Sequence, residues 1–586
     1  MSVLVIGGGY AGLTAALDCA KEEEVVIVLR TPELGGLFSK LHLVDGKHPS
    51  DILSPLIEQL KENEKILVFT NSVIEHVEKE NQDFTVRVRK KPVRIDETKC
   101  DSCGECWKIC PVRAPDRHNE WLSDRNAVYS PEEALSYAIE RETPFCQATC
   151  PVNLDVRGYA GLIADGKFKE AYELIRAKVP FPGILGRVCT HPCEDRCKRG
   201  LVDEPISIAK LKRFVADYVY ANHSAEIKPP PFPPTSGKKV AIIGAGPAGL
   251  TAAYDLKSFG YDVTVFEKLS VIGGMMAVGI PEYRLPRATL EREIECVRDI
   301  EIKTGVDVDR DMFAELRSTY DAVFISVGAH VSGNLGIPGE DLAGVIPGVE
   351  LLRTLNLGNN VRIGTRVVVV GGGNVAIDAA RSVLRLGSDV CIVYRRSRAE
   401  MPASKEEVES LEEEGIKIIF LANPTRILGS KNVEGIECVR MALGPPDESG
   451  RRRPVPVEGS EFVLDVDTVI PAIGQASDLT FLEGSGVDTP GGRWISTSPD
   501  GRTSVEGVFA GGDAATGAKT VIEAIAAGKR AALSINDYLN GEKRAGFTVE
   551  PEFDFDECEA REKLKLSQEY FTLHDRARQK RVEMPK

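Results

Sequence analysis

The chain lacks the features that would place it in a membrane, on a nucleic acid or outside the cell. It has no run of about 20 apolar residues, the length that crosses a bilayer. Its net charge is -15, whereas a nucleic-acid-binding surface needs a basic stripe. The N-terminal MSVLVIGGG has neither the long apolar core nor the cleavage site of a signal peptide. We therefore expect a cytoplasmic protein without a membrane span that binds no nucleic acid.

Cysteine is unevenly spread along the chain. The 14 cysteines are many for a cytoplasmic protein, in which disulfides are rare, and most lie between residues 100 and 197. Bunching of this kind in a reducing compartment points to metal ligation. The other five are scattered: Cys19, Cys296, Cys391, Cys438 and Cys558. We therefore expect no redox-active cysteine pair in the nucleotide-binding regions.

The first set has the spacing CxxCxxCxxxCP, and a loop with three cysteines at that spacing wraps an iron–sulfur cube. In two-cluster ferredoxins the fourth cysteine serves the other cluster, but no second copy of the motif follows here. Zinc, the alternative, usually takes two separated CxxC pairs. We expect one 4Fe-4S cluster held by Cys100, Cys103, Cys106 and Cys110.

The second set lies in FCQATCP and RVCTHPCEDRC, with cysteines four residues apart. On a helix such residues share a face, and the stretch between the two motifs has helical periodicity, so a small helical domain is predicted. Four of the five cysteines would hold a second 4Fe-4S cluster, with zinc as the alternative and His191 as a structural residue. The five are Cys146, Cys150, Cys189, Cys193 and Cys197.

One glycine motif occurs three times: GGGYAG at 7–12, GAGPAG at 244–249 and GGGNVA at 371–376. Each copy follows an apolar strand and precedes a helical pattern, which is the context of a Rossmann fingerprint. There the glycines permit a tight turn and let a pyrophosphate approach the helix N-terminus.

The second copy is the most complete. Its second strand ends at Glu267, about 20 residues after the loop, where an acid binds the adenosine ribose. Far downstream, GVFAGGDAATG and a helix starting near Thr520 supply the expected second half of an FAD site, since that helix would aim its N-terminal dipole at the flavin. The predicted FAD residues are Gly244, Gly246, Gly249, Glu267, Gly512, Asp513 and Thr520.

The other two copies depart from this pattern. In the third the acid is absent and two arginines stand nearby, which favours the 2′-phosphate of NADP(H) over NAD(H), unless the arginines are simply a solvated pair. In the first, Leu29 stands where the acid would be, and no GGD strand follows before the cysteines. We expect the first copy to bind no flavin unless a partner completes it. The predicted NADPH residues are Gly371, Gly373, Asn374, Arg395 and Arg396.

The motifs CQATCP, GRVCTHPCEDRC, GAGPAGL, GIPEYRLP, GGGNVAID, VYRRSRAEMPA and AGGDAATG carry a family resemblance. Over residues 146–540 the chain resembles the glutamate synthase small subunit, the NADPH-binding flavoprotein subunit of transhydrogenase and the N-terminal half of dihydropyrimidine dehydrogenase. Residues 1–130 resemble part of the heterodisulfide reductase flavoprotein subunit. The resemblance adds Gly274 and Arg284 to the expected FAD contacts. Relatives carry a further CxxC before the second cysteine set, so the ferredoxin-like loop is expected to replace a missing cluster.

The predicted fold is α/β, with two nested Rossmann-like nucleotide-binding domains of the disulfide-oxidoreductase type. A truncated Rossmann-like domain (1–95), a ferredoxin-like insert (96–130) and a helical iron–sulfur domain (131–230) precede them. The FAD-binding domain is expected at 236–350 and 465–543, the NAD(P)H-binding domain at 351–464 and a tail at 544–586.

These features predict a redox relay. NADPH would reduce FAD, and electrons would leave singly through the two clusters. No terminal substrate site and no certain catalytic residue are recognisable, so other redox subunits of a larger complex are the expected partners, with bifurcation left open. Two alternatives remain, a glutamate synthase small subunit and a non-catalytic assembly scaffold. The intact Glu267, Asp513 and cysteine sets count against the scaffold.

Overall fold

The computed structural model describes residues 2–30, 34–36, 38, 44, 47–63, 65–70, 72–80, 83–90, 106, 113–115, 124–126, 128–129, 138–139, 144–201, 203–223, 232–447 and 450–541. It separates into two compact units, Met1–Thr143 and Pro144–Lys586. Of the first cysteine set only Cys106 is among the described residues, so the predicted ferredoxin-like loop lies outside them, as does the expected tail at 544–586.

The first unit contains a parallel three-stranded sheet in the order β1-β2-β3, so that β1 pairs with β2 alone among the described strands. Its core includes Leu13, Ile27 and Leu53, which come from the sheet and from the two helices packed on it. These elements are β1 (Ser2–Ile6), α1 (Tyr10–Cys19), β2 (Glu24–Val28), α2 (Pro49–Lys61) and β3 (Ile66–Phe69). Antiparallel pairs follow: β4 (Ser72–Glu80) with β5 (Asp83–Lys90), β6 (Arg113–Pro115) with β7 (Asp124–Asn126), and β8 (Val128–Tyr129) with β9 (Ala138–Ile139).

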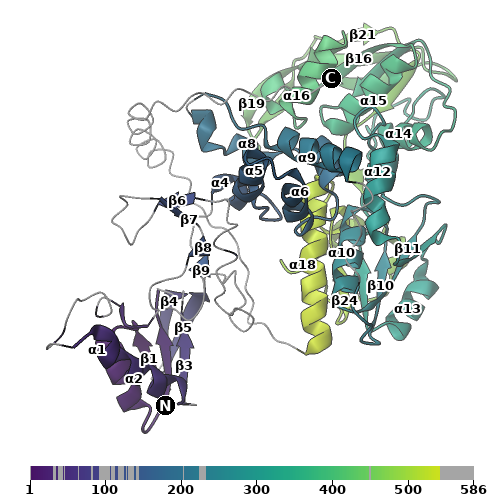
Figure 1. Cartoon of the computed structure of the whole chain (residues 1–586). Helices are drawn as coiled ribbons and strands as arrows, with labels where there is room; N and C mark the ends of the chain where they lie inside the picture. Colours follow the sequence, from purple (N-terminus) through teal and green to yellow (C-terminus); the bar gives the residue numbers. More distant parts are fainter. Residues whose placement is uncertain are drawn as a thin grey trace. The chain divides into compact units, whose positions relative to one another are not determined.

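The second unit opens with a helical segment that carries the second cysteine set (Figure 1). Its helices are short because glycines and prolines punctuate the sequence, and α7 packs on α9 while α5 packs on α6. The elements are α4 (Phe145–Ala148), α5 (Val156–Ala164), α6 (Phe168–Arg176), α7 (Pro182–Val188), α8 (Pro192–Asp195), η3 (Lys198–Leu201) and α9 (Ile208–Asn222).

A five-stranded parallel sheet follows, in the order β12-β11-β10-β13-β24. Two helices that are far apart in sequence, α10 and α18, lie side by side against it (Figure 1). Its strands are β10 (Lys239–Ile243), β11 (Asp262–Glu267), β12 (Glu301–Thr304), β13 (Ala322–Ile325) and β24 (Val508–Ala510). Its helices are α10 (Pro247–Ser258), α11 (Met275–Val278), α12 (Arg287–Ile294), η4 (Glu295–Val297), α13 (Arg310–Thr319), α17 (Asp513–Thr516) and α18 (Val521–Asn540).

A second parallel sheet, in the order β17-β16-β15-β22, is inserted in sequence between β13 and β24. Its elements are α14 (Gly348–Asn356), β15 (Arg366–Val370), α15 (Asn374–Arg385), β16 (Asp389–Tyr394), η5 (Arg398–Glu400), α16 (Lys405–Glu413), β17 (Lys417–Phe420) and β22 (Thr468–Pro471). An antiparallel sheet adds β18 (Ala422–Leu428), β19 (Gly435–Pro446), β20 (Arg452–Pro456) and β21 (Phe462–Leu464). Strands β14 (Val331–Ser332) and β23 (Gln475–Ala476), which lie on either side of this insertion in the sequence, pair antiparallel. The short helices η6 (Thr480–Leu482) and η7 (Pro490–Gly492) follow. The prediction of two nested Rossmann-like domains is confirmed.

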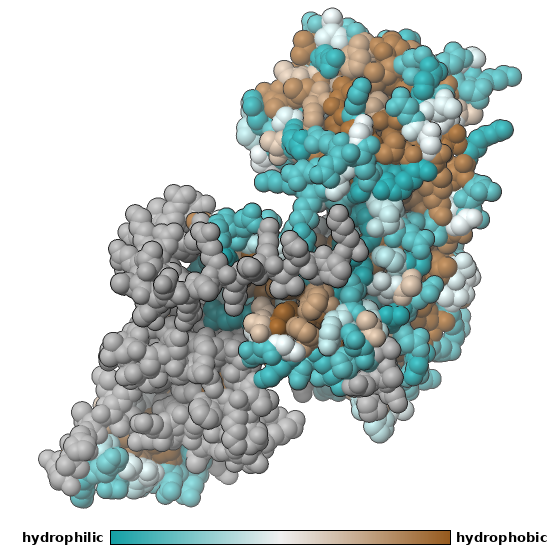
Figure 2. All heavy atoms as spheres, turned by 45° about the horizontal axis from the view of Figure 1, so that its top comes forward, coloured by the Kyte–Doolittle hydropathy of each residue, from teal (hydrophilic) through white to brown (hydrophobic). Residues whose placement is uncertain are grey.

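The helical segment and the five-stranded sheet share one hydrophobic core, which includes Phe181, Ile184 and Val240. Glu293 on α12 reinforces this contact, because its carboxylate accepts a hydrogen bond of 3.1 Å from the Ile184 N–H while wholly buried. On the face drawn in Figure 2, hydrophobic residues are interspersed with polar ones. No helix within the described ranges has the length and apolar character that a membrane span requires.

Candidate flavin, nucleotide and cluster sites

Two glycines of the second loop, Gly249 and Gly246, have different structural roles. A Cβ at Gly249 would lie 2.0 Å from the carbonyl oxygen of Gly244, so this glycine allows α10 to pack closely on the turn after β10. A Cβ at Gly246 would meet nothing nearer than the Gly274 Cα at 3.9 Å. Gly246 is the N-cap of α10 and has no side chain to cap it, so the free N–H groups there face open space that an anionic group could occupy.

Glu267 ends β11 with its side chain only 7% exposed. One carboxylate oxygen accepts from the Ala245 N–H at 2.7 Å and the other from the Leu269 N–H at 2.8 Å. Each oxygen keeps a second lone-pair direction, so the carboxylate can still accept a bond from a ribose hydroxyl. The acid is thus held rigidly next to the glycine loop.

The second half of the site comes from the far end of the sequence. After β24, Gly512 adopts φ 66° and Asp513 begins α17. Burial raises the pKa of Asp513 to about 6, and one of its carboxylate oxygens accepts from the Lys519 N–H at 3.1 Å. Thr520 caps α18 in a capping box with Glu523, which fixes the direction of that helix end.

These groups line one cavity of about 660 Å³. A volume of that size suits a cofactor, since ligand sites span roughly 300–1,000 Å³. Gly249 lies behind the loop and does not line it. The predicted FAD residues that the structure brings together here are Gly244, Gly246, Glu267, Gly274, Gly512, Asp513 and Thr520.

His330 and Arg353 also line this cavity, and no sequence motif marks either residue. A guanidinium nitrogen of Arg353 donates to the His330 carbonyl oxygen at 3.1 Å. Burial, together with the nearby Arg353 charge, lowers the pKa of His330 to about 4. The imidazole is therefore neutral at pH 7.

Arg284 lies elsewhere, in a separate cavity of about 430 Å³. Its guanidinium bonds to Asp378 on α15 at 2.7 Å and to Glu407 on α16 at 3.0 Å. Its neighbour Tyr283 stacks under Arg385, 4.1 Å from the ring centroid. Tyr283 and Arg284 therefore contact the inserted domain. The FAD contact predicted for Arg284 remains a prediction.

The third loop repeats the same turn. Gly371 N–H donates to the Val393 carbonyl at 3.1 Å, which aligns Tyr394 with the acid of the second loop. Arg395 is exposed at the end of β16, whereas Arg396 is 5% exposed and pairs with Asp447. Gly373 is the N-cap of α15, where Asn374 lines the 430 Å³ cavity. Arg395 is thus the arginine of the pair that could meet a phosphate.

Four of the five cysteines of the second set are associated with one hydrophobic core. Cys193 lies in the same core as Tyr159, and the thiols of Cys146, Cys150 and Cys189 pack against that core. Burial raises the pKa of Cys193 to about 12. The His191 N–H lies 3.4 Å from the Cys189 sulfur.

Within the described residues, no three or more His, Cys, Asp or Glu side chains are arranged to hold a metal ion. Each cysteine of an iron–sulfur cube binds a different iron, so its thiols stand further apart than the ligands of a single zinc ion. The donor set, thiols in an apolar shell with a backbone N–H on one sulfur, suits such a cube.

Family models match along most of the chain. The model for pyridine nucleotide-disulphide oxidoreductase matches residues 238–528, and that for dihydropyrimidine dehydrogenase domain II, 4Fe-4S cluster, matches 117–224. A 4Fe-4S binding domain matches 93–116 and an FAD binding domain matches 2–46. The last match counts against the expectation that the first loop takes no flavin.

Similar proteins point the same way. The chain is 50% identical over 459 residues to the NADP(+)-dependent formate dehydrogenase subunit beta of Moorella thermoacetica, covering 73% of this chain and 64% of that protein. It is 44% identical over 485 residues to the NADPH-Fe(3+) oxidoreductase subunit beta of Geobacter sulfurreducens, covering 76% and 71%. It is 35% identical over 438 residues to the glutamate synthase (NADPH) small chain of Halomonas elongata, covering 70% and 92%. The chain therefore belongs to the family that includes the NADPH-Fe(3+) oxidoreductase subunit beta and the glutamate synthase (NADPH) small chain, and it spans 64% of the length of the formate dehydrogenase subunit.

Proposed function

We propose that the 660 Å³ cavity is the FAD site and that electrons pass through it between NADPH and the clusters. The observation that carries the proposal is that Gly246 and Glu267, from one motif, line the same cavity as Asp513, which comes from the far end of the sequence. When bound there, the flavin supplies the exchange between a two-electron donor and one-electron clusters.

The residues of the chain have separable tasks in this site. Glu267 accepts from ribose hydroxyls, and the open space at Gly246 admits the pyrophosphate to the α10 N-terminus. The α18 N-terminus, fixed by Thr520, favours negative charge at its end of the cavity. Asp513, which lines the same cavity, would accept a hydrogen bond from a ribityl or ribose hydroxyl.

For the pyridine nucleotide we propose NADP(H), bound at the third loop by Gly371, Gly373, Asn374 and Arg395. Arg395 is exposed at the strand end, where it can pair with a 2′-phosphate. Arg396 is itself buried and pairs with Asp447, so we assign it a structural role next to Arg395. This refines the role expected for the two arginines together.

We propose two 4Fe-4S clusters, one held by Cys100, Cys103, Cys106 and Cys110 and one by four of the five second-set cysteines. The domain boundaries expected from the sequence are part of the same proposal. Other redox subunits are the proposed partners, because the relatives named above are themselves subunits. The proposed location is the cytoplasm. A glutamate synthase small subunit is the second candidate, favoured by the 92% coverage of that chain.

Anaerobic purification with flavin and iron analysis tests the cofactor proposal. We expect one FAD and about eight irons per chain, since each cube holds four. Iron near four or near twelve would overturn the cluster count, and absence of FAD would overturn the flavin site. Co-purifying chains would identify the partners.

The nucleotide assignment needs a matched pair of variants. Arg395→Gln should raise the KM for NADPH about tenfold or more and leave that for NADH nearly unchanged, because one charge-assisted pair with the 2′-phosphate is lost. The control is Arg398→Gln, which removes another exposed arginine nearby that pairs with Glu412. Equal effects on both nucleotides would contradict the assignment.

A further inference from the structure

A tyrosine with an unpaired hydroxyl lies among the second-set cysteines. Tyr159 is on α5, is 0% exposed, and its hydroxyl oxygen is buried with no hydrogen-bond partner. A buried hydroxyl without a partner is costly, and such groups are rare in folded proteins. The position therefore calls for an acceptor or donor supplied by a bound group.

Cysteines of the second set lie on the helices next to Tyr159. Helix α4, which carries Cys146, packs on α5 and also on α8, which carries Cys193. Cys193 and Tyr159 belong to one hydrophobic core, and Cys146, Cys150 and Cys189 pack against that core. A tyrosine hydroxyl can donate one bond, and cluster sulfides and cysteine thiolates accept such bonds.

We propose that the Tyr159 hydroxyl donates a hydrogen bond to a sulfur of the second-set cluster and so raises its reduction potential. The inference rests on the proposed function, since it requires that cluster to be present. The reduced cluster carries one more negative charge, which a donor stabilises more than it stabilises the oxidised form.

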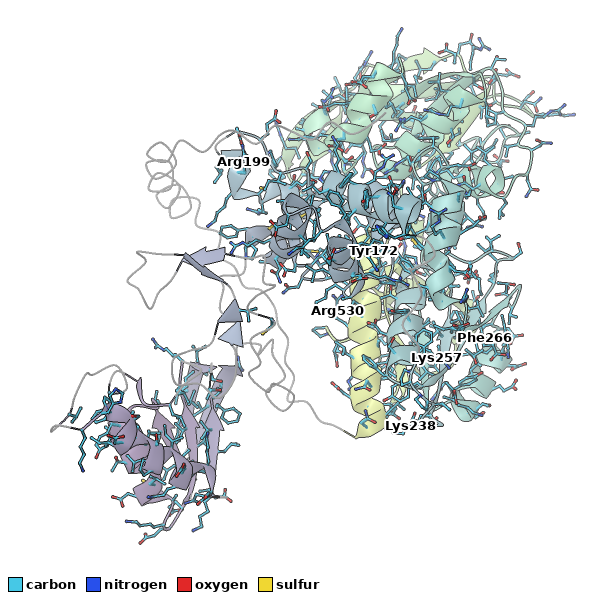
Figure 3. The ribbon with its side chains drawn as sticks, in the orientation of Figure 1. Tyr172, Arg199, Lys238, Lys257, Phe266 and Arg530 are labelled. Atoms are coloured by element: carbon cyan, nitrogen blue, oxygen red, sulfur yellow. The ribbon has the colours of Figure 1, made fainter. Side chains whose placement is uncertain are left out.

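The test replaces the hydroxyl alone. Tyr159→Phe keeps the ring that fills the core, and its matched control is Tyr220→Phe. Tyr220, on α9, also has a buried hydroxyl without a partner. Its ring instead makes an edge-to-face contact with Tyr172 (labelled in Figure 3), with 5.9 Å between the ring centroids, and lies under Arg292. The measurements are iron per chain and the two cluster midpoints, from anaerobic redox titration followed by electron paramagnetic resonance.

We expect Tyr159→Phe to retain its iron and to lower one midpoint. Loss of one hydrogen bond should change that reduction equilibrium about three- to tenfold, which for one electron is about 30–60 mV. Tyr220→Phe should leave both midpoints unchanged. Unchanged midpoints in an iron-replete Tyr159→Phe protein would overturn the inference.

A second measurement applies if Tyr159→Phe loses iron. Site-specific 3-fluorotyrosine at position 159 keeps the ring and makes the hydroxyl a stronger donor, so the midpoint should rise; an unchanged midpoint would overturn the inference. If the wild-type chain itself shows only one cluster and about four irons, the cluster proposal fails instead, and the two failures are thereby distinguished.

Discussion

The first and second glycine loops are nearly the same locally, and they differ in what surrounds them. Gly7 and Gly244 have φ of 110° and 104°, and each N–H donates at 2.8 Å to a carbonyl of the next strand. A Cβ at Gly12 would lie 2.1 Å from a loop carbonyl oxygen, against 2.0 Å at Gly249. The glycine fingerprint thus specifies the turn and its packing equally well in both.

The difference begins at the end of the second strand. The equivalent backbone bonds align Leu29 with Glu267, and Leu29 is 3% exposed in the core of the first unit. The sheets differ as well, because β10 has neighbours on both sides whereas β1 pairs only with β2 in the described residues. The glycine loop therefore predicts a fold element, while the prediction that the first loop binds no flavin depends on Leu29 and on the flanking strands.

The largest expected effect comes from placing a side chain in the packed glycine. Gly249→Val should abolish bound FAD and destabilise the second unit by about 3 kcal/mol or more, since the clash at 2.0 Å is with backbone. Gly12→Val creates the same clash in the first unit and should leave the FAD content unchanged. Flavin analysis and thermal unfolding of both variants provide the measurement, and an equal loss of FAD would break the comparison.

The next effect comes from making the second loop resemble the first. Glu267→Leu leaves the Ala245 and Leu269 N–H groups without their acceptor and should cost about 2–4 kcal/mol in folding and FAD affinity together. Its control is Glu301→Leu, on the neighbouring strand, where one bond from the Thr264 hydroxyl is lost. Flavin fluorescence gives the dissociation constant, and equal values for both variants would contradict the role of Glu267.

Asp513 follows a strand that has no counterpart among the described strands of the first unit, and it leads to a smaller, pH-dependent prediction. Its folded-state pKa of about 6 exceeds the ordinary value of 3.8, so the folded state binds the proton more tightly than the unfolded chain. Its contribution to stability is greatest below pH 3.8 and falls as the pH rises to about 6. Between pH 5 and 7, flavin-free wild type should lose about 1 kcal/mol relative to Asp513→Asn in urea unfolding.

Asp500 provides a control of opposite sign. Burial opposes its ionisation, but hydrogen bonds from Ser498, Arg502 and Ser534 outweigh burial and lower its pKa. Its stabilising effect is therefore present above pH 3.8 and lost only as the pH falls through the lowered value. Relative to Asp500→Asn, wild type should not lose stability between pH 5 and 7, and matching pH profiles for the two variants would contradict the assignment.

The sequence predicted the nested domains and the convergence of Glu267 and Asp513, because each follows an apolar strand at a spacing that fixes its place on the sheet edge. It did not predict that Arg284 reaches Asp378, 94 residues away, since that pair depends on how two domains dock. For the same reason it treated Arg395 and Arg396 alike, although only the latter finds a buried partner in the β19–β20 turn. Local periodicity predicts individual helices and strands, whereas contacts between domains depend on how the domains pack together.

The smallest expected effect is that of Gly9→Trp, which tests directly whether the first loop differs from the second in binding no FAD. A Cβ at Gly9 would meet only the Gly35 carbonyl oxygen at 3.9 Å, and one at Gly246 only the Gly274 Cα, also at 3.9 Å, so a side chain can begin at either position without a clash. Gly246→Trp should fill the space through which the pyrophosphate approaches the helix and so remove FAD. Gly9→Trp should leave one FAD per chain, because we expect no flavin at the first loop. Leu29 offers ribose hydroxyls no acceptor, and burying each hydroxyl without a hydrogen bond costs about 1–3 kcal/mol. The match of an FAD binding domain to residues 2–46 argues the other way. A wild-type ratio near two that falls to one in Gly9→Trp would show that the first loop is occupied and that the acid is dispensable there.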